Sequence, residues 1–352
     1  MKQRLDALLC AAFEVKASDV HLTVGVPPIF RINGELKKYG QDVLRPEDTE
    51  GMAKAVIPPR LWPQFEENGE LDFSYGIPGV SRFRINTYKQ RSCVSLAIRI
   101  IPTKIPTIDE LRLPEVLKQI AQKPHGLVLV TGPTGSGKST TLAAMIDYMN
   151  KTMRKHIITL EDPIEYLHKH GSCIIDQREV GFDTNNFANG LRAALRQDPD
   201  VILVGEMRDL ETIHTAITAA ETGHLVLGTL HTSSAPATID RIIDVFPPAQ
   251  QSQIRIQLAS VLVAIISQRL FPTPQKTGRI AATEVLINNA AVANLIRNEK
   301  VHQIANVMQT SRALGMHTLA MSIKELMQAG LILRDAAEPY LAQERGDSYA
   351  SV

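Results

Sequence analysis

The chain is poor in cysteine and has no long apolar run. Its three cysteines, Cys10, Cys93 and Cys173, lie far apart and form no C-x-x-C pair. This spacing argues against a zinc ribbon or a disulfide framework and fits a reducing compartment. No stretch approaches the roughly 18 apolar residues of a membrane span, and the N-terminal residues lack the pattern of a secretory signal. We therefore expect a cytoplasmic protein, which can still dock peripherally on a membrane complex.

The chain also lacks an excess of charge of either sign. Its 38 basic and 37 acidic residues leave a formal net charge of +1. A protein held mainly by nucleic-acid phosphates needs a bulk positive excess, so we expect no stable nucleic-acid partner. Lys151, Arg154 and Lys155 form a local basic cluster, which keeps a nucleic-acid motor open as an alternative.

The length of 352 residues, 44% of them hydrophobic, indicates two domains. Residues 1–100 read as a small α/β domain, in which Leu5 to Phe13 have helical spacing and Val20 to Val24 alternate as a half-buried strand does. Asn33-Gly34 is a strong signal for a two-residue hairpin turn. Three prolines between residues 101 and 114 predict an interdomain linker, because each fixes the backbone angle φ.

Residues 115–335 read as a second domain in which strands and helices alternate. Near-continuous apolar runs of this kind are typical of parallel strands covered on both faces. The pattern predicts a doubly wound, mostly parallel sheet whose ligands lie at the carboxyl ends of its strands. Residues 336–352 read as a polar tail. The strands are expected at Leu127 to Thr131, His156 to Leu160, Val201 to Val204 and Leu225 to Leu230.

A complete phosphate-binding loop, G-x-x-x-x-G-K-[ST], directly follows the first of these runs. A strand that delivers the loop and a helix that leaves it are the context in which backbone N–H groups converge on phosphate oxygens. Lys138 would reach the β- and γ-phosphates, and the Ser139 hydroxyl would ligate Mg²⁺. The loop consists of Gly132, Pro133, Thr134, Gly135, Ser136, Gly137, Lys138, Ser139 and Thr140.

Acidic residues follow the next two strands, where they can orient an attacking water or support a metal ion. Glu206 is our choice for the water-orienting residue, and the alternative is an acid that complements the dipole of the following helix. Glu161 is the competing catalytic candidate. Asp162 reads as structural or as a water-mediated metal contact, and Glu161 can share the latter role. We expect the two glutamates to act together.

Two histidines flank the fourth strand, His224 before it and His231 after it. Their spacing alone favours histidines that are held at the strand ends by hydrogen bonds. A zinc site is disfavoured, because the sequence has no third ligand at a compatible spacing. In the first domain, Arg82 and Arg84 alternate with apolar residues along one strand, and Arg99 lies on the polar face of the next. Periodicity alone does not decide whether these arginines are simply solvated or have a functional role, and we treat the two interpretations as about equal.

These motifs together resemble the PilT-type twitching-motility ATPases of the type II/type IV secretion ATPase superfamily. The resemblance covers nearly the whole chain. It includes the segments Ala17 to Leu22, Pro27 to Gly34 and Arg82 to Asn86, the phosphate loop, the aspartate box from Ile158 to Glu165, the Walker B segment ending at Glu206 and the histidine box from Thr222 to Thr232.

The resemblance implies a PAS-like N-terminal domain and a RecA-like ATPase domain, assembled as a homohexamer. It implies Mg²⁺-dependent hydrolysis of ATP to ADP and phosphate, with the nucleotide between the two domains. Arg82, Arg84 and Arg99 would then approach its phosphates, and His231, with His224 less strongly, would sense the nucleotide state. The implied partner is an inner-membrane pilus platform protein, through which the ATPase would be held at the inner face of the cytoplasmic membrane.

Within the superfamily, pilus-extension and type II secretion ATPases usually carry an added N-terminal region and a paired C-x-x-C element. This chain has neither, so we expect pilus retraction, with extension or secretion as alternatives. One element departs from the pattern of retraction ATPases, because Ala293 replaces an arginine and Asn298 stands where an acid is usual. A nucleotide switch that does not hydrolyse ATP is disfavoured, since a pure binder needs no positioned carboxylates.

Overall fold

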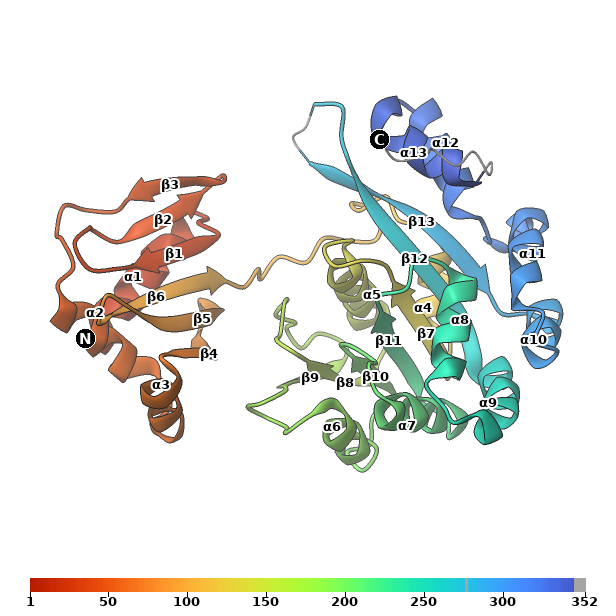
Figure 1. Ribbon diagram of the computed structural model, residues 1–352, viewed down its shortest axis with the longest axis horizontal. Coiled ribbons are helices and arrows are strands. Elements are labelled where there is room, and N and C mark those ends of the chain that lie inside the picture. Colours follow the sequence, from red (N-terminus) through yellow and green to blue (C-terminus); the bar gives the residue numbers. More distant parts are fainter. Residues whose placement is uncertain (276–277, 345–352) are drawn as a thin grey trace. The chain divides into compact units, whose positions relative to one another are not determined.

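The computed structural model describes residues 1–275 and 278–344 of the chain (Figure 1). These residues form two compact units. The first comprises Met1–Lys104 together with the short segment Glu165–Leu167, and the second comprises Ile105–Ile164 and the described residues from His168 onward. The chain therefore passes between the units three times, and the first passage falls within the proline-containing stretch 101–114.

The first unit is built on an antiparallel six-stranded sheet in the order β3-β2-β1-β6-β5-β4. Helices α1 and α2 pack against this sheet. Its strands are β1 (Asp19–Leu22), β2 (Ile29–Ile32), β3 (Glu35–Lys38), β4 (Glu70–Ile77), β5 (Ser81–Gln90) and β6 (Cys93–Ile100). Its helices are α1 (Lys2–Glu14), α2 (Pro46–Val56), the 3₁₀ turn η1 (Pro59–Leu61) and α3 (Trp62–Asn68).

The sequence pattern of this unit matches its structure closely. Asn33 and Gly34 have positive φ angles of 51° and 85°, so the predicted hairpin turn between β2 and β3 is confirmed. Along β5, Phe83 and Ile85 are fully buried while Arg84 between them is exposed. The alternation places apolar side chains in the core and leaves arginines on the other face of the sheet.

The second unit is built on a seven-stranded sheet in the order β13-β12-β7-β11-β10-β8-β9. All neighbouring strands from β12 to β9 pair in parallel, and only β13 is antiparallel to its neighbour. The strands are β7 (Gly126–Thr131), β8 (His156–Glu161), β9 (Ile174–Glu179), β10 (Val201–Val204), β11 (Leu225–Leu230), β12 (Leu262–Pro272) and β13 (Arg279–Ile287). The expected fold class, a small α/β domain followed by a domain with a mostly parallel sheet, is confirmed.

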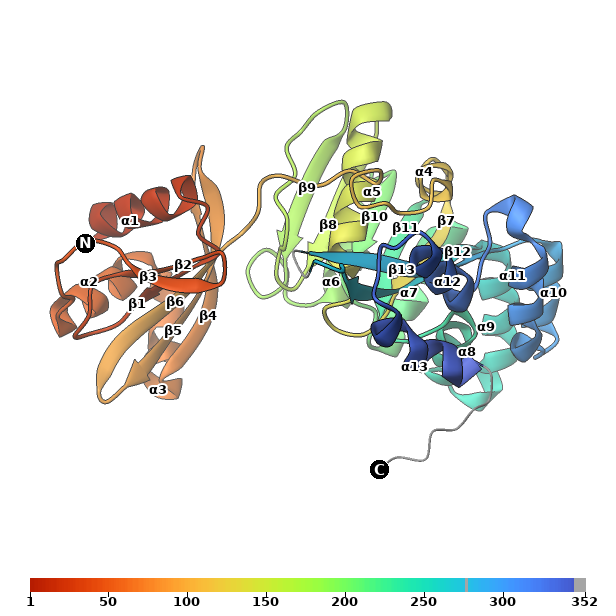
Figure 2. The same ribbon diagram turned by 90° about the horizontal axis from the view of Figure 1, so that it is seen from above.

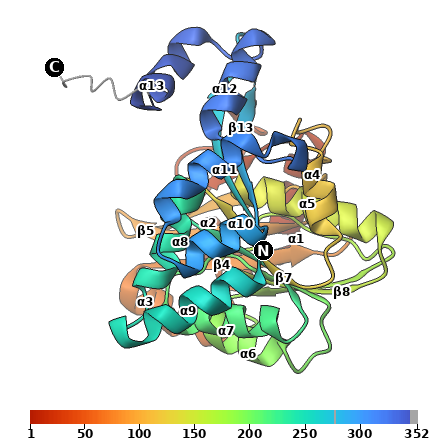
Figure 3. The same cartoon turned by 90° about the vertical axis from the view of Figure 1, so that its right-hand side faces the viewer.

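Helices cover both faces of this sheet, as Figures 2 and 3 show. Val128 and Val130 of β7 pack with α4 and α5 on one face, and Leu127 and Leu129 pack with α6 to α11 on the other. Burial on both faces explains why these strands are uninterrupted apolar runs. The helices are α4 (Val116–Ala121), α5 (Lys138–Thr152), α6 (Phe187–Ala194), α7 (Leu210–Glu221), α8 (Ala235–Asp244), α9 (Pro248–Val261), α10 (Ala290–Arg297), η2 (Val301–Gln303), α11 (Ile304–Thr310) and η3 (Arg312–Leu314).

Two further helices, α12 (Leu319–Gln328) and α13 (Arg334–Glu344), pack beside the β12–β13 hairpin. Residues 336–344 were expected to begin a polar tail, but they form most of α13. Ala337 of this helix is fully buried, and the ring of Tyr340 meets Phe271 edge-on at 5.3 Å. Residues 345–352 lie outside the described residues. Among the described helices, none is both long and apolar enough to cross a bilayer.

Candidate functional site

The predicted phosphate loop lies between the carboxyl end of β7 and the first turn of α5. Gly132, Gly135 and Gly137 have φ angles of 141°, 78° and 91°, which favour glycine. A Cβ atom on Gly132 would lie 2.4 Å from the backbone oxygen of Gln268 and 2.6 Å from the Ser136 hydroxyl. The loop is therefore a tight backbone cradle, and such a cradle at a helix N-terminus is suited to phosphate.

Gln268 of β12 anchors this loop, and sequence reasoning missed it. Its side chain accepts a hydrogen bond from the Thr141 hydroxyl at 2.9 Å and donates one to the Ser136 carbonyl at 2.7 Å. Gln268 is only 2% exposed. A polar pair, Ser267-Gln268, inside an apolar strand was the available signal, because a buried polar side chain needs partners.

Lys138 and Ser139 occupy the start of α5. The ammonium group of Lys138 donates to the carbonyl oxygens of Gly132 and Pro133 at 2.8 and 3.1 Å, so the lysine lies against the loop. Ser139 is half-buried in the first turn. The glycine cradle, a cation and a hydroxyl at one helix end are a donor set that fits a nucleotide phosphate with its Mg²⁺.

The polar residues after the neighbouring strands reach the same edge of the sheet. Thr131 at the end of β7 is paired with Leu230 of β11. Val204 at the end of β10 is paired with Gly228 of β11 on one side and Leu160 of β8 on the other. The side chains that follow these strands therefore gather at the carboxyl edge that carries the phosphate loop.

Glu206 is held by two cationic or potentially cationic side chains at this edge. One oxygen of its carboxylate lies 2.8 Å from Nε2 of His231 and 2.5 Å from Nε of Arg208. Partial burial acts to raise the pKa of Glu206, but Arg208 and His231 outweigh it, so the pKa is lowered. Glu206 is thus oriented and ionised. The hydrogen bond to Glu206 raises the pKa of Arg208, and the charge of Asp162 adds to this effect.

Glu161 is positioned by residues of two neighbouring strands. Its Oε1 accepts hydrogen bonds from the Thr159 hydroxyl at 2.6 Å and from Nε2 of Gln177 at 3.0 Å. Thr159 belongs to the same strand, β8, whereas Gln177 belongs to β9. Asp162, the next residue after Glu161, is exposed. Gln177 was not identified from the sequence, because β9 is a short, largely polar strand without an apolar run.

The two histidines of the histidine box lie at opposite ends of β11. His231 follows the strand and contacts Glu206, whereas His224 precedes it. Nδ1 of His224 lies 3.0 Å from the carbonyl oxygen of Ala219 at the end of α7. The structure therefore brings His231 to the carboxyl edge of the sheet and leaves His224 at the amino edge.

The three arginines singled out in the first domain share one face of its sheet. Arg84 of β5 is directly opposite Arg99 of β6, and Arg82 lies two residues before Arg84 on β5. Arg99 donates to Asp19 at 3.1 Å, and Asp19 also lies 3.9 Å from Arg31. These side chains form a row across four neighbouring strands. Its order is Arg84 on β5, Arg99 on β6, Asp19 on β1 and Arg31 on β2.

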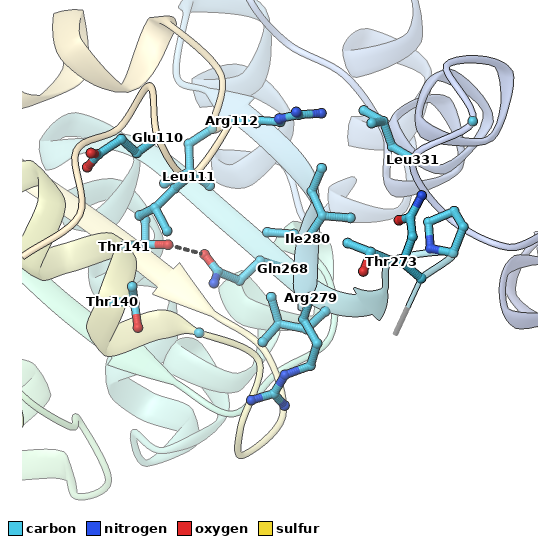
Figure 4. A pocket seen from close by; sticks show the side chains of 17 residues that line it. Glu110, Leu111, Arg112, Thr140, Thr141, Gln268, Thr273, Arg279, Ile280 and Leu331 are labelled. Atoms are coloured by element: carbon cyan, nitrogen blue, oxygen red, sulfur yellow. Dashed lines mark hydrogen bonds between the residues drawn. The ribbon is translucent and has the colours of Figure 1, made fainter. Parts of the chain in front are cut away.

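Beside the phosphate loop, the second unit contains a pocket of about 640 Å³. Thr140 and Thr141 line one side of it (Figure 4), and Gly137 is a further lining residue. Apolar side chains of Leu111, Leu270, Ile280 and Leu331 also line it, and its charged lining residues are the two cations Arg112 and Arg279 and the acidic Glu110. The pocket thus joins the start of α5 to an apolar wall with positive charge, a combination that suits a nucleoside next to its phosphates.

Ala293 and Asn298, the two departures from the retraction pattern, lie at α10. Ala293 is 7% exposed and belongs to the core beneath the helix. Asn298 caps the C-terminal end of α10, where its side-chain amide donates to the Asn294 carbonyl at 2.8 Å. The altered residues therefore have structural roles in packing and in ending the helix.

The chain matches known proteins over most of its length. Residues 1–329 match the family described as "Type II/IV secretion system protein". The chain is 49% identical to the "Type IV pilus retractation ATPase PilT" of Pseudomonas aeruginosa, over 95% of this chain and 97% of that protein. It is 48% identical to a "Twitching motility protein" of Neisseria gonorrhoeae, over 88% of this chain and 83% of that protein.

A solved structure agrees with these matches. The crystal structure of the pilus retraction motor PilT with bound ADP superimposes on this chain with a TM-score of 0.86, at 50% sequence identity and with 94% of each chain covered. A match over 94% of the chain includes residues of both units.

Proposed function

Because the chain belongs to the Type II/IV secretion system protein family, we propose that it is an ATP-hydrolysing motor that powers type IV pilus retraction. Two relatives that match most of the chain are named as a pilus retraction ATPase and a twitching motility protein. The observation that carries the proposal is Glu206, oriented by His231 and Arg208 at the sheet edge that also presents the phosphate loop.

Each residue of this edge has a task in phosphoryl transfer to water. The glycine cradle and Lys138 bind the phosphate oxygens, and Lys138 offsets the negative charge that develops on the transferred group. Ser139 would ligate Mg²⁺, which neutralises further charge on the phosphates, and Asp162 and Glu161 would contact it through water. Glu206 orients the attacking water and accepts its proton, while Glu161 shares the positioning of that water.

The pocket beside the loop supports a nucleoside triphosphate as the substrate. Thr140 and Thr141 connect the phosphate loop to the pocket, and Leu270 and Ile280 supply an apolar wall of the kind on which a base packs. Arg112 and Arg279 add positive charge where the α- and β-phosphates would leave the loop. The crystal structure of the related motor contains ADP.

Assembly and location form the finer part of the proposal, and they rest on the family resemblance. We expect a homohexamer in which Arg82, Arg84 and Arg99 approach the phosphates and His231 reports the nucleotide state, with His224 acting only indirectly. The expected partner is an inner-membrane pilus platform protein that holds the ring at the cytoplasmic face of the membrane. Neither a stable nucleic-acid partner nor a membrane span is part of the proposal.

Turnover of MgATP by purified variants tests the assignment. Lys138→Ala and Glu206→Ala should each lower kcat on the order of a hundredfold or more, because each removes charge stabilisation or positioning in the transition state. Lys123→Ala and Glu115→Ala, which change the same residue types at exposed positions outside the site, are the matched controls. Rates equal to wild type in both site variants would contradict the assignment.

The biological direction of the motor is tested in the cell. A strain that lacks the protein should accumulate pili that do not retract. A strain without pili would instead indicate an extension motor, and unaltered pili with a secretion defect would indicate a secretion ATPase.

A further inference from the structure

The side-chain amide of Gln177 connects Glu161 to the backbone of His168, which lies in the segment between β8 and β9. Gln177 Oε1 accepts a hydrogen bond from the backbone N–H of His168 at 2.8 Å, and its Nε2 donates to Glu161 at 3.0 Å. A backbone N–H can only donate, so the carbonyl oxygen of the amide must face His168 and its NH₂ group must face the carboxylate. Both bonds therefore use the same orientation of the Gln177 side chain.

His168 directly follows the crossover segment, which is our name for Glu165–Leu167, the three residues that belong to the first unit. Within that unit the N–H of Leu167 donates to the carbonyl of Pro102 at 3.4 Å. At the other end of the crossover segment, the N–H of Ile164 donates to Glu179 at 3.3 Å. Gln177 and Glu179 are two residues apart on β9, so one strand holds the backbone at both ends of the segment.

Glu179 is 2% exposed, which makes its bond to the Ile164 N–H a well-shielded anchor. Gln177 is different, because its second bond reaches a residue of the proposed catalytic edge. The two polar ends of an amide group are held rigidly in one plane. A displacement of the His168 backbone therefore moves the donor that orients Glu161.

We propose that Gln177 is a positioning residue, which fixes the Glu161 carboxylate for ATP hydrolysis and links its orientation to the crossover segment. This inference rests on the proposed function, in which Glu161 helps to position the attacking water. A charge-assisted hydrogen bond is the strongest kind available to a neutral side chain, and its loss should be expressed in the chemical step. Nucleotide binding at the phosphate loop should be almost unaffected.

Two substitutions separate the bond of Gln177 to His168 from its bond to Glu161. Gln177→Glu retains an acceptor for the His168 N–H but replaces the donor to Glu161 by a second carboxylate. Gln177→Met removes both bonds at similar volume. We expect kcat for MgATP to fall about tenfold or more in both variants, with KM changed less than about twofold. Gln257→Glu, which alters an exposed Gln–Glu pair with Glu221 at 3.1 Å, should behave as wild type.

The outcomes distinguish this role from a structural one. If Gln177 only anchors the backbone, Gln177→Glu retains wild-type kcat and only Gln177→Met is impaired, which would overturn the proposal. The double variant Glu161→Gln/Gln177→Glu should be no slower than Glu161→Gln alone, because Gln177 acts through Glu161. Additive losses would contradict this. Wild-type turnover of Glu161→Gln would overturn the catalytic assignment of Glu161 itself, and the positioning role with it.

Discussion

Replacing Gly205 by alanine should slow ATP turnover, because this glycine allows the strand ends that carry Glu206 and Glu161 to approach each other closely. A Cβ atom at position 205 would lie 2.9 Å from the carbonyl oxygen of Leu160 and 3.3 Å from Cα of Glu161. The same carbonyl accepts a hydrogen bond from the Gly205 N–H at 2.7 Å, so it is held close to the glycine. Both atoms belong to the backbone, which cannot rotate away as a side chain can.

The magnitude follows from the size of this overlap. Ordinary carbon contacts begin near 3.4 Å, so the ends of β8 and β10 must separate by about half an ångström, which typically costs about 1–3 kcal/mol. A misplacement of about 1 Å at a reacting group can cost about a hundredfold in rate, so about half that distance should cost about tenfold. The melting temperature should fall by roughly 2–12 °C for a unit of this size.

MgATP turnover and thermal unfolding measured on the same protein preparation test both parts. Gly76→Ala is the matched control, since Gly76 also lies in a strand but a Cβ atom there would have nothing within 4 Å. The control should retain wild-type turnover and melting temperature. If Gly205→Ala does so too, the two carboxylates do not depend on the close approach of these strand ends, and the reasoning fails.

Two further predictions concern buried polar groups. Burial lowers the pKa of His168 to about 4 from its usual 6.5, against a smaller opposing effect of the Asp147 charge. Between these two pH values the unfolded chain binds more protons at His168 than the folded chain does. The free energy of unfolding is therefore highest above about pH 6.5, and it decreases as the pH falls toward 4. His168→Asn should remove up to roughly 3 kcal/mol of this pH dependence in thermal unfolding, and an unchanged dependence would refute the shift. Gln268→Leu should weaken nucleotide binding about 5- to 100-fold, because the Ser136 carbonyl and the Thr141 hydroxyl lose their buried partner. Titration with a fluorescent ADP analogue measures this effect, and wild-type affinity would show that Gln268 does not support the loop.

Local patterns in the sequence were sufficient to predict most of the elements that carry the site. The strands at Val201–Val204 and Leu225–Leu230 have the bounds expected from their apolar runs. Asp209 caps α7 through its side chain, which accepts a hydrogen bond from the Thr212 N–H at 2.8 Å. These elements were predictable from residues that are adjacent in the sequence. A strand buried on both faces is a continuous apolar run, and a capping residue directly precedes its helix.

Other elements could not be found in this way. Strand β9 contains Asp176, Gln177, Arg178 and Glu179, and this polar composition hides it. Helix α13 was expected to be part of a polar tail, because its buried residues become apparent only when Phe271 of β12 is in place. Gln177 and Gln268 both lie on strands that were not predicted, so their support for the site remained hidden too.

The sequence by itself determined the chemical groups of this protein: a glycine loop with Lys138 and Ser139, and acidic residues at strand ends. Only the tertiary structure decided which partners hold them. Glu161 bonds to a residue 16 positions away, Glu206 beyond the end of β10 contacts His231 at the end of the adjacent strand β11, and Thr141 bonds to a residue 127 positions away. These contacts depend on the order β12-β7-β11-β10-β8-β9, in which β12 lies beside β7 although four other strands separate the two in the chain. Local periodicity reports only whether a side chain is buried, and not which strand lies beside it.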